Sequence, residues 1–255
     1  MSFPLALQLF SPVVGRGSPA DQTDASRWLL SLVSHPSTPA ILAERAQQLL
    51  ARLIAHRSLS STTLPNSSPL LTAQHFVDAL VRLGIKTSLV DHPGHNRMVI
   101  EGAAMDLDDT TLGRPVESGE RSDSVLRTLK VVCSLASATP RSLLSSTDTT
   151  SLAVLLVRLA VDPIAGPMRA GLERTLHALL VTLPAQGLRQ RTEVIQDLVA
   201  TFLHTTVRTK LEVVLVIPHA TKASKLLRKA LAWALLADSL PTFVRPCLIL
   251  FISLP

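Results

Sequence analysis

Two histidines three residues apart, His92 and His95 in the segment DHPGH, have the spacing that could hold a metal ion. Asp91 stands beside them, and the segment MDLDD at 105–109 adds carboxylates downstream. Imidazole nitrogens and carboxylate oxygens are zinc ligands, so a metal-dependent hydrolase is one hypothesis. A catalytic site of this kind needs ligands at defined spacing on rigid elements, and this stretch shows none. We therefore expect a solvated loop, with no metal, cofactor or catalytic residue.

The sequence also lacks the compact motifs that mark common enzymes. It contains no G-x-S-x-G elbow, no phosphate-binding Walker loop, no dinucleotide fingerprint and no H-E-x-x-H pair. These motifs place a nucleophile, a phosphate cradle or a metal on a particular local structure. The sequence therefore favours a protein that binds a partner over one that catalyses a reaction.

Basic residues concentrate between positions 189 and 229. Lys222, Lys225 and Lys229 fall at i, i+3 and i+7, so they share one face of a helix, with Arg228 beside them. Such a face could contact the phosphates of nucleic acid, or an acidic protein, in a salt-dependent way. The alternative is a solvated face that keeps an apolar helix soluble. Both interpretations stay open at this point.

Trp233 follows the basic cluster and is a candidate anchor for a protein partner, although it could equally pack at a helix seam. Aromatic residues make up 3% of the chain and tyrosine is absent. A platform for stacking single-stranded bases is therefore disfavoured, because such platforms need several rings.

Composition indicates a helical protein. Of the 255 residues 47% are apolar, mostly Leu, Ala and Val, which suit helix-on-helix packing better than a β-sandwich. No apolar run reaches the roughly 18 residues that a membrane-spanning helix needs. The net charge is +6, which permits an anionic partner. Cys133 and Cys247 stand among apolar residues, so we expect buried thiols in a reducing compartment.

Periodicity divides the chain into five parts. The strongest helical pattern runs from Ser122 to Leu183, and it continues to 237. We expect a flexible leader at 1–23, N-terminal helices at 24–84, a long irregular connection at 85–121, a helical core at 122–237 and an apolar tail at 238–255. Consecutive helices with Pro-marked turns and no clean repeat predict an all-α fold, an irregular α-solenoid or HEAT-like helical array.

Local signals predict several helix ends. Asp24 is the expected N-cap of the first helix, and Thr72 begins a short helix that stops at Gly84. In the core, helices are expected at about 148–161 and 167–184, and the last at about 221–237. Two short stretches are less certain. Residues 212–217 are compatible with strand or helix because β-branched residues abound, and a short strand is conceivable at 98–100.

The core resembles a known helical family. The strings VLRTLKVVCSLA and LAVLLVRLAVDP, a helix ending ALLVTLP, and KLLRKALAWALL after the turn at Pro218 are similar to the CANIN domain. That domain belongs to the non-SMC element six subunit of the SMC five–six genome-maintenance complex. The resemblance covers about residues 122–237 and rests on a pattern of Leu, Asp-Pro and basic residues.

The resemblance implies a non-enzymatic, nuclear subunit of a DNA-repair complex. Such a subunit would form a heterodimer with a second regulatory subunit, dock on the SMC heads and assist loading on DNA, with no membrane association. From the residues alone we reach an intracellular helical scaffold. The alternatives are a generic HEAT-like adaptor and a nucleic-acid-binding protein that uses the basic 189–229 region.

Overall fold

A computed structural model describes residues 18–60, 69–83, 85, 118–138, 143–186 and 188–236. These residues form α-helices and one 3-10 helix, and none of them is in a strand, so the expected all-α class is confirmed. The strand considered at 98–100 lies outside these ranges. Among the described helices, none is long and apolar enough to cross a membrane.

Helix α3 (Pro19–Ser34) begins earlier than expected. Ser18 is its N-cap: the Ser18 Oγ accepts from the Asp21 N–H at 3.2 Å, and the Asp21 carboxylate accepts from the Ser18 N–H at 2.9 Å. This reciprocal capping box, with proline at the first helical position, is a stronger start signal than Asp24. The predicted N-cap at Asp24 is therefore wrong, and the expected leader loses residues 18–23 to this helix.

The next two helices, α4 and α5, lie within the stretch at 24–84 that was expected to contain helices. Helix α4 (Ala40–Ser60) follows Pro39 and packs against α3. Helix α5 (Ala73–Arg82) has Thr72 as its N-cap, as predicted, and buries Phe76 and Leu80 on one face. The predicted stop at Gly84 lies outside the described residues.

Helix α7 (Ser118–Ala136) starts inside the stretch predicted to be an irregular connection. Residues 118–121 are helical, and the connection at 86–117 lies outside the described residues. The first turn is charged and contains a glycine, so no apolar periodicity marks it in the sequence. Glu120 in that turn is favourable, because a carboxylate complements the positive end of the helix dipole.

Helix α8 (Ser146–Val161) ends at Val161, as predicted, with Asp162 as its C-cap immediately before Pro163. A 3-10 helix, η2 (Pro163–Met168), leads into α9 (Arg169–Gln186). The expected end of α9 at Pro184 is wrong by two residues.

Helices α10 (Leu188–Phe202), α11 (Val207–Val216) and α12 (Lys222–Leu236) complete the described chain. The stretch at 212–217, for which strand and helix were both open, is helical through Val216. Val213, Val214 and Val216 are buried there. Packing against α8 and α12 thus overrides the β preference of the branched residues.

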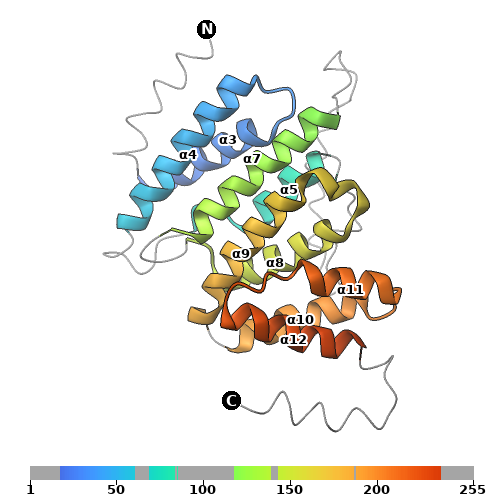
Figure 1. Ribbon diagram of the computed structural model, residues 1–255. Coiled ribbons are helices and arrows are strands. Elements are labelled where there is room, and N and C mark those ends of the chain that lie inside the picture. The colour runs from blue at the N-terminus through green and yellow to red at the C-terminus, as the bar shows by residue number, and fades with distance from the viewer. Residues whose placement is uncertain are drawn as a thin grey trace, which may run out of the picture.

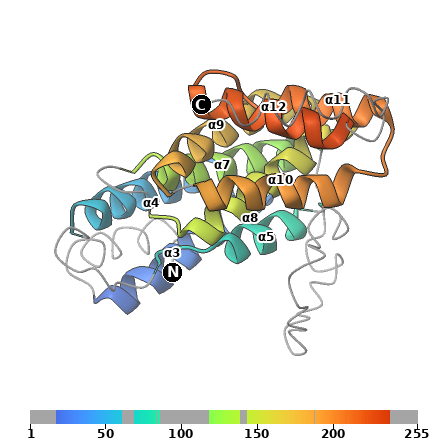
Figure 2. The same ribbon diagram turned by 90° about the horizontal axis from the view of Figure 1, so that it is seen from below.

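The helices do not form a one-dimensional stack. Helices α3 and α4 lie at one end, α10, α11 and α12 lie at the other, and α7, α8 and α9 lie between them (Figures 1 and 2). Helix α8 contacts α5, α9, α10 and α11, including elements far from it in sequence. In a solenoid each repeat contacts its neighbours alone, so a solenoid arrangement is not confirmed. The N-terminal helices pack on α7, and one hydrophobic core extends from Ala25 to Leu235.

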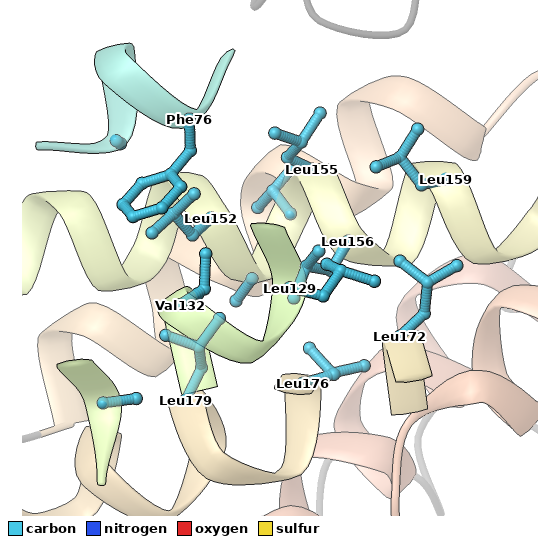
Figure 3. Packing of buried hydrophobic residues seen from close by; sticks show 14 of the residues in the cluster. Phe76, Leu129, Val132, Leu152, Leu155, Leu156, Leu159, Leu172, Leu176 and Leu179 are labelled. Atoms are coloured by element: carbon cyan, nitrogen blue, oxygen red, sulfur yellow. The ribbon is translucent and has the colours of Figure 1, made fainter. Parts of the chain in front are cut away.

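Helix α8 is the centre of this core. Leu152, Leu155, Leu156 and Leu159 are buried, and Figure 3 shows Leu156 on the side of Leu129 of α7 and of Leu172 and Leu176 of α9, with Phe76 of α5 close to Leu152. A helix that is apolar on all sides must be enclosed by others. The remaining helices are therefore positioned by their contacts with α8 or with α7 and α9 beside it.

Helices α7 and α9 approach each other closely at Gly171. A Cβ at this position would lie 2.6 Å from the Leu126 Cδ2, so a side chain there would displace that leucine. One turn later the Thr175 hydroxyl donates to the Leu129 carbonyl oxygen of α7 at 3.3 Å. Small and hydroxyl side chains thus bring the two helices together.

Candidate functional site

Helices α11 and α12 form a hairpin, and each begins with a hydroxyl cap. The Thr206 Oγ1 accepts from the Thr209 N–H at 3.3 Å at the start of α11. At the start of α12, the Ser224 N–H donates to the Thr221 Oγ1 and the Thr221 N–H donates to the Ser224 Oγ, both at 3.1 Å. These reciprocal bonds satisfy helix-end donors and fix where α12 begins, and therefore which of its side chains face outward.

A groove of about 470 Å³ lies between the two helices. Its lining consists of one residue of α11 and six of α12: Val214, Lys222, Lys225, Leu226, Arg228, Lys229 and Ala232. All four basic residues singled out from the sequence are therefore brought to one place. Their helical spacing aligns them, and packing against α11 turns the row into one wall of a groove.

The electrostatics of the groove are one-sided. Helix α12 contains no Asp or Glu. Within the described chain, no acidic side chain pairs with Lys222, Lys225 or Arg228. Lys222 and Lys225 lie in the first turn of α12, near the positive end of its dipole, where an exposed cation costs roughly 0.3–1 kcal/mol. An anionic group bound here would be attracted by the side chains and by the dipole together.

The groove also has an apolar component. Leu226 lines it and is 49% exposed, while Val214 and Ala232 contribute small apolar surfaces. On α11, Leu211 and Leu215 are 45% and 57% exposed, and Leu211 lies one turn before Val214 on the helix surface. Large apolar side chains exposed together mark an interaction site more often than isolated ones do.

The rest of the basic region does not join this groove. Arg208 pairs with Glu212 on its own helix, with Nε and Oε1 3.2 Å apart. Lys210 is buried. Arg191 is half-buried on α10, and the side chain of Arg189 is outside the described set. Of the basic residues between 189 and 229, the tertiary structure therefore leaves the four cations of α12 as the candidate binding residues.

Trp233, the predicted partner anchor, is half-buried on α12 and is not among the groove-lining residues. It follows Lys229 by four positions and Leu226 by seven, so it continues their stripe along the helix. Trp28, by contrast, packs against the hydrophobic core. Cys133 is a free, half-buried thiol rather than a fully buried one, and Cys247 lies outside the described residues.

A polar cluster that the sequence did not suggest lies where α5 meets α8. The Asp148 carboxylate accepts from the Ala73 N–H at 2.7 Å and from the Ser145 hydroxyl at 2.5 Å. His75 Nδ1 accepts from the Thr72 N–H at 3.0 Å. These groups are occupied in helix capping, so the cluster reads as a structural tie rather than a catalytic Ser-His-Asp arrangement. No sequence signal joins residues 73 and 148, because they are far apart along the chain.

Charge and burial both act on His75. Burial is the larger cause that lowers its pKa, and the Arg27 charge lowers it further, whereas Asp78 and Asp148 raise it. The imidazole is therefore held more in its neutral form than a free histidine. This favours its role as an acceptor at the start of α5.

No three metal-ligating side chains gather among the residues that the structure describes. The His92 and His95 pair considered as a metal site lies outside those residues, as do Asp106, Asp108 and Asp109. The α11–α12 groove is a surface among the described residues with a defined shape and charge.

Comparisons with protein-family models, with curated proteins and with solved structures find no match to this chain. The similarity to the CANIN family accordingly stays a prediction from the sequence.

Proposed function

We propose that this chain is a non-catalytic helical scaffold that binds a partner subunit of a multi-protein complex. The observation that supports this most is the α11–α12 hairpin, which exposes Leu226 beside a row of cations on α12 and Leu211 and Leu215 on α11. Burying three leucines of this exposure would contribute favourable free energy to association, since each apolar Å² removed from water stabilises by roughly 25 cal/mol.

Several polar side chains of the described residues are occupied in structural hydrogen bonds. Ser18, Thr72, Ser145 and Thr206 cap helices, and Asp148 ties α5 to α8. Groups held in caps are poorly placed to act as nucleophiles or proton carriers, because their lone pairs or protons are engaged. The proposal of a binding role follows from where the exposed apolar and charged groups remain.

The resemblance to the CANIN domain extends the proposal to a chromosome-maintenance complex in the nucleus, with a regulatory subunit as the heterodimer partner. This part rests on the sequence strings between about 122 and 237. The resemblance also implies a helical scaffold, and it names the complex in which the partner should be sought.

Nucleic acid is a second candidate ligand, favoured by the four cations of α12. Phosphate contacts by Lys and Arg would give binding that weakens steeply with salt. The exposed Leu226 between the cations favours a protein over a duplex, since phosphates offer no apolar surface.

Affinity purification of the tagged full-length chain from its own cells, followed by gel filtration at high salt, tests the scaffold. We expect a second chain in stoichiometric amount, identified by mass spectrometry. A folded chain that elutes alone would contradict the scaffold proposal. A stable partner from outside any chromosome complex would contradict the extension drawn from the resemblance and leave the scaffold standing.

A further inference from the structure

We propose that the α11–α12 groove binds an acidic amphipathic helix of a partner protein, with leucine-like anchors in the groove and carboxylates on its cationic wall. The inference deepens the proposed scaffold function and rests on it. It assigns the surface used and the chemistry of the segment bound.

The length of the groove suits a helix. Its lining runs from Lys222 to Ala232, ten positions along α12, which is roughly 15 Å or about three helical turns. A helix that lies in such a groove presents side chains at i, i+4, i+7 and i+11 to its floor. The floor offers Val214 and Ala232, both small enough to admit larger side chains from a partner.

Helix α11 also carries an exposed apolar stripe of its own. Val207, Leu211 and Leu215 fall at i, i+4 and i+8, and each is about half exposed. An amphipathic helix could cover part of this stripe while its anchors occupy the groove. A small anionic ligand would leave the stripe in water, so the exposed leucines favour a larger, amphipathic occupant.

Charge selects among amphipathic segments. Lys222, Lys225 and Arg228 have no acidic partner in the described chain, so a bound segment needs carboxylates to neutralise them. The chain's own residues 237–255 are a poor candidate, because they contain one acidic side chain, Asp238, and one basic one, Arg245. A second copy would bring another cationic α12 to the same place. An acidic segment of a different protein meets both requirements.

The test uses the full-length chain and three fluorescent peptides, measured by anisotropy. The first peptide is helical, with leucines at i, i+4 and i+7 flanked by glutamates. The second keeps the leucines and replaces the glutamates with lysines, and the third keeps the glutamates and replaces the leucines with alanines. We expect the first to bind at least about tenfold more tightly than either of the others, because each lacks one of the two complementary features.

Matched substitutions locate the site. Leu226→Gln and the pair Lys222→Glu with Lys225→Glu should each weaken the acidic peptide about tenfold or more. Ile41→Gln is the apolar control, since Ile41 is 73% exposed on α4, and Lys130→Glu on α7 is the charge control. Both controls lie outside the groove and should leave the affinity unchanged. Circular dichroism of each variant verifies that the helices are retained.

Several results would overturn the inference. Equal binding of all three peptides, or no binding, would remove it. Duplex DNA that displaces the peptide and binds Leu226→Gln as well as the original chain would assign the cations to nucleic acid. Self-association abolished by Leu226→Gln would assign the groove to a second copy. If a native partner co-purifies equally with Leu226→Gln and the charge-reversed chain, the scaffold proposal stands and the groove assignment fails.

Discussion

The carboxylate of Asp148 accepts a hydrogen bond from the backbone N–H of Ala73, with Oδ1 and N 2.7 Å apart. Asp148 belongs to the first turn of α8 and Ala73 to the first turn of α5, so one carboxylate serves the N-termini of two helices. Its second oxygen accepts from the Ser145 hydroxyl. The charge lies where both helix dipoles favour it. This contact fixes α5 against the central helix.

Replacing Asp148 with alanine should therefore destabilise the fold. The Ala73 N–H and the Ser145 hydroxyl both lose their acceptor, and we expect the free energy of unfolding to fall by about 1–3 kcal/mol. Asp148→Asn keeps an acceptor oxygen and removes the charge, so it should lower the free energy of unfolding by less than Asp148→Ala does. Urea unfolding monitored by circular dichroism measures both. Equal stability of Asp148→Ala and the original chain would show that the tie contributes nothing.

His75 should make stability depend on pH in a defined direction. In the folded chain, burial and the Arg27 charge lower the pKa of the His75 imidazole below its ordinary value of 6.5. The charges of Asp78 and Asp148 oppose this shift. Between the lowered pKa and 6.5 the unfolded chain binds more protons than the folded one, so stability rises with pH there. The contribution of neutral His75 to the free energy of unfolding is complete above about pH 6.5. It is lost as the pH falls from 6.5 to the lowered pKa of the folded chain.

Urea unfolding between about pH 5 and 8 would measure this slope. The matched control is His75→Gln, because glutamine at this position can still accept the N-cap N–H while it does not titrate. We expect its stability at pH 7.5 to be close to that of the original chain, and its slope below pH 6.5 to be flatter. An unchanged slope in His75→Gln would assign the pH dependence to other groups.

Arg158 is a buried cation in the last turn of the apolar helix α8, and it reaches toward α10. Its Nη2 donates to the Thr201 Oγ1 at 2.6 Å, and Thr201 in turn donates to the Asp197 carbonyl oxygen. Burial lowers the pKa of the Arg158 guanidinium, and the Asp197 charge raises it in part. Arg158 thus couples α8 to α10 through a network of polar contacts.

We expect Arg158→Ala to reduce the free energy of unfolding by about 2–4 kcal/mol, because it removes a buried stem and the hydrogen bond together. Thr201→Val should cost about 1 kcal/mol, since it leaves the guanidinium with one acceptor fewer. Chemical denaturation of both single variants and the double variant forms a cycle. The double variant should lose less free energy of unfolding than the two single variants lose together. Strict additivity of the two losses would mean that the side chains of Arg158 and Thr201 do not interact.

Much of the helical content could be predicted from local signals. Thr72 caps α5, Asp162-Pro163 ends α8, and Lys222, Lys225 and Lys229 share one side of α12, as their spacing indicates. The starts of α3 and α7 differ from the predicted ones. The capping box at Ser18 outweighs Asp24, and the charged start of α7 carries no apolar period.

Other features depend on residues far apart in sequence. The spacing in 212–217 permits strand or helix, and burial of the valines against α8 and α12 decides for helix. The basic region reads as one block in the sequence. In the fold Lys210 is buried, Arg208 pairs with Glu212, and the α12 cations remain at the groove.

The sequence by itself determined an all-α fold, several of its helix ends and the cationic row of α12. Capping, helix propensity and side-chain periodicity act over a few residues, so they are readable along the chain. The tertiary structure alone decided that α8 is enclosed, that Asp148 meets Ala73, and that α11 supplies the second wall of the groove. These relationships depend on how apolar faces pack between distant segments, which no local pattern specifies.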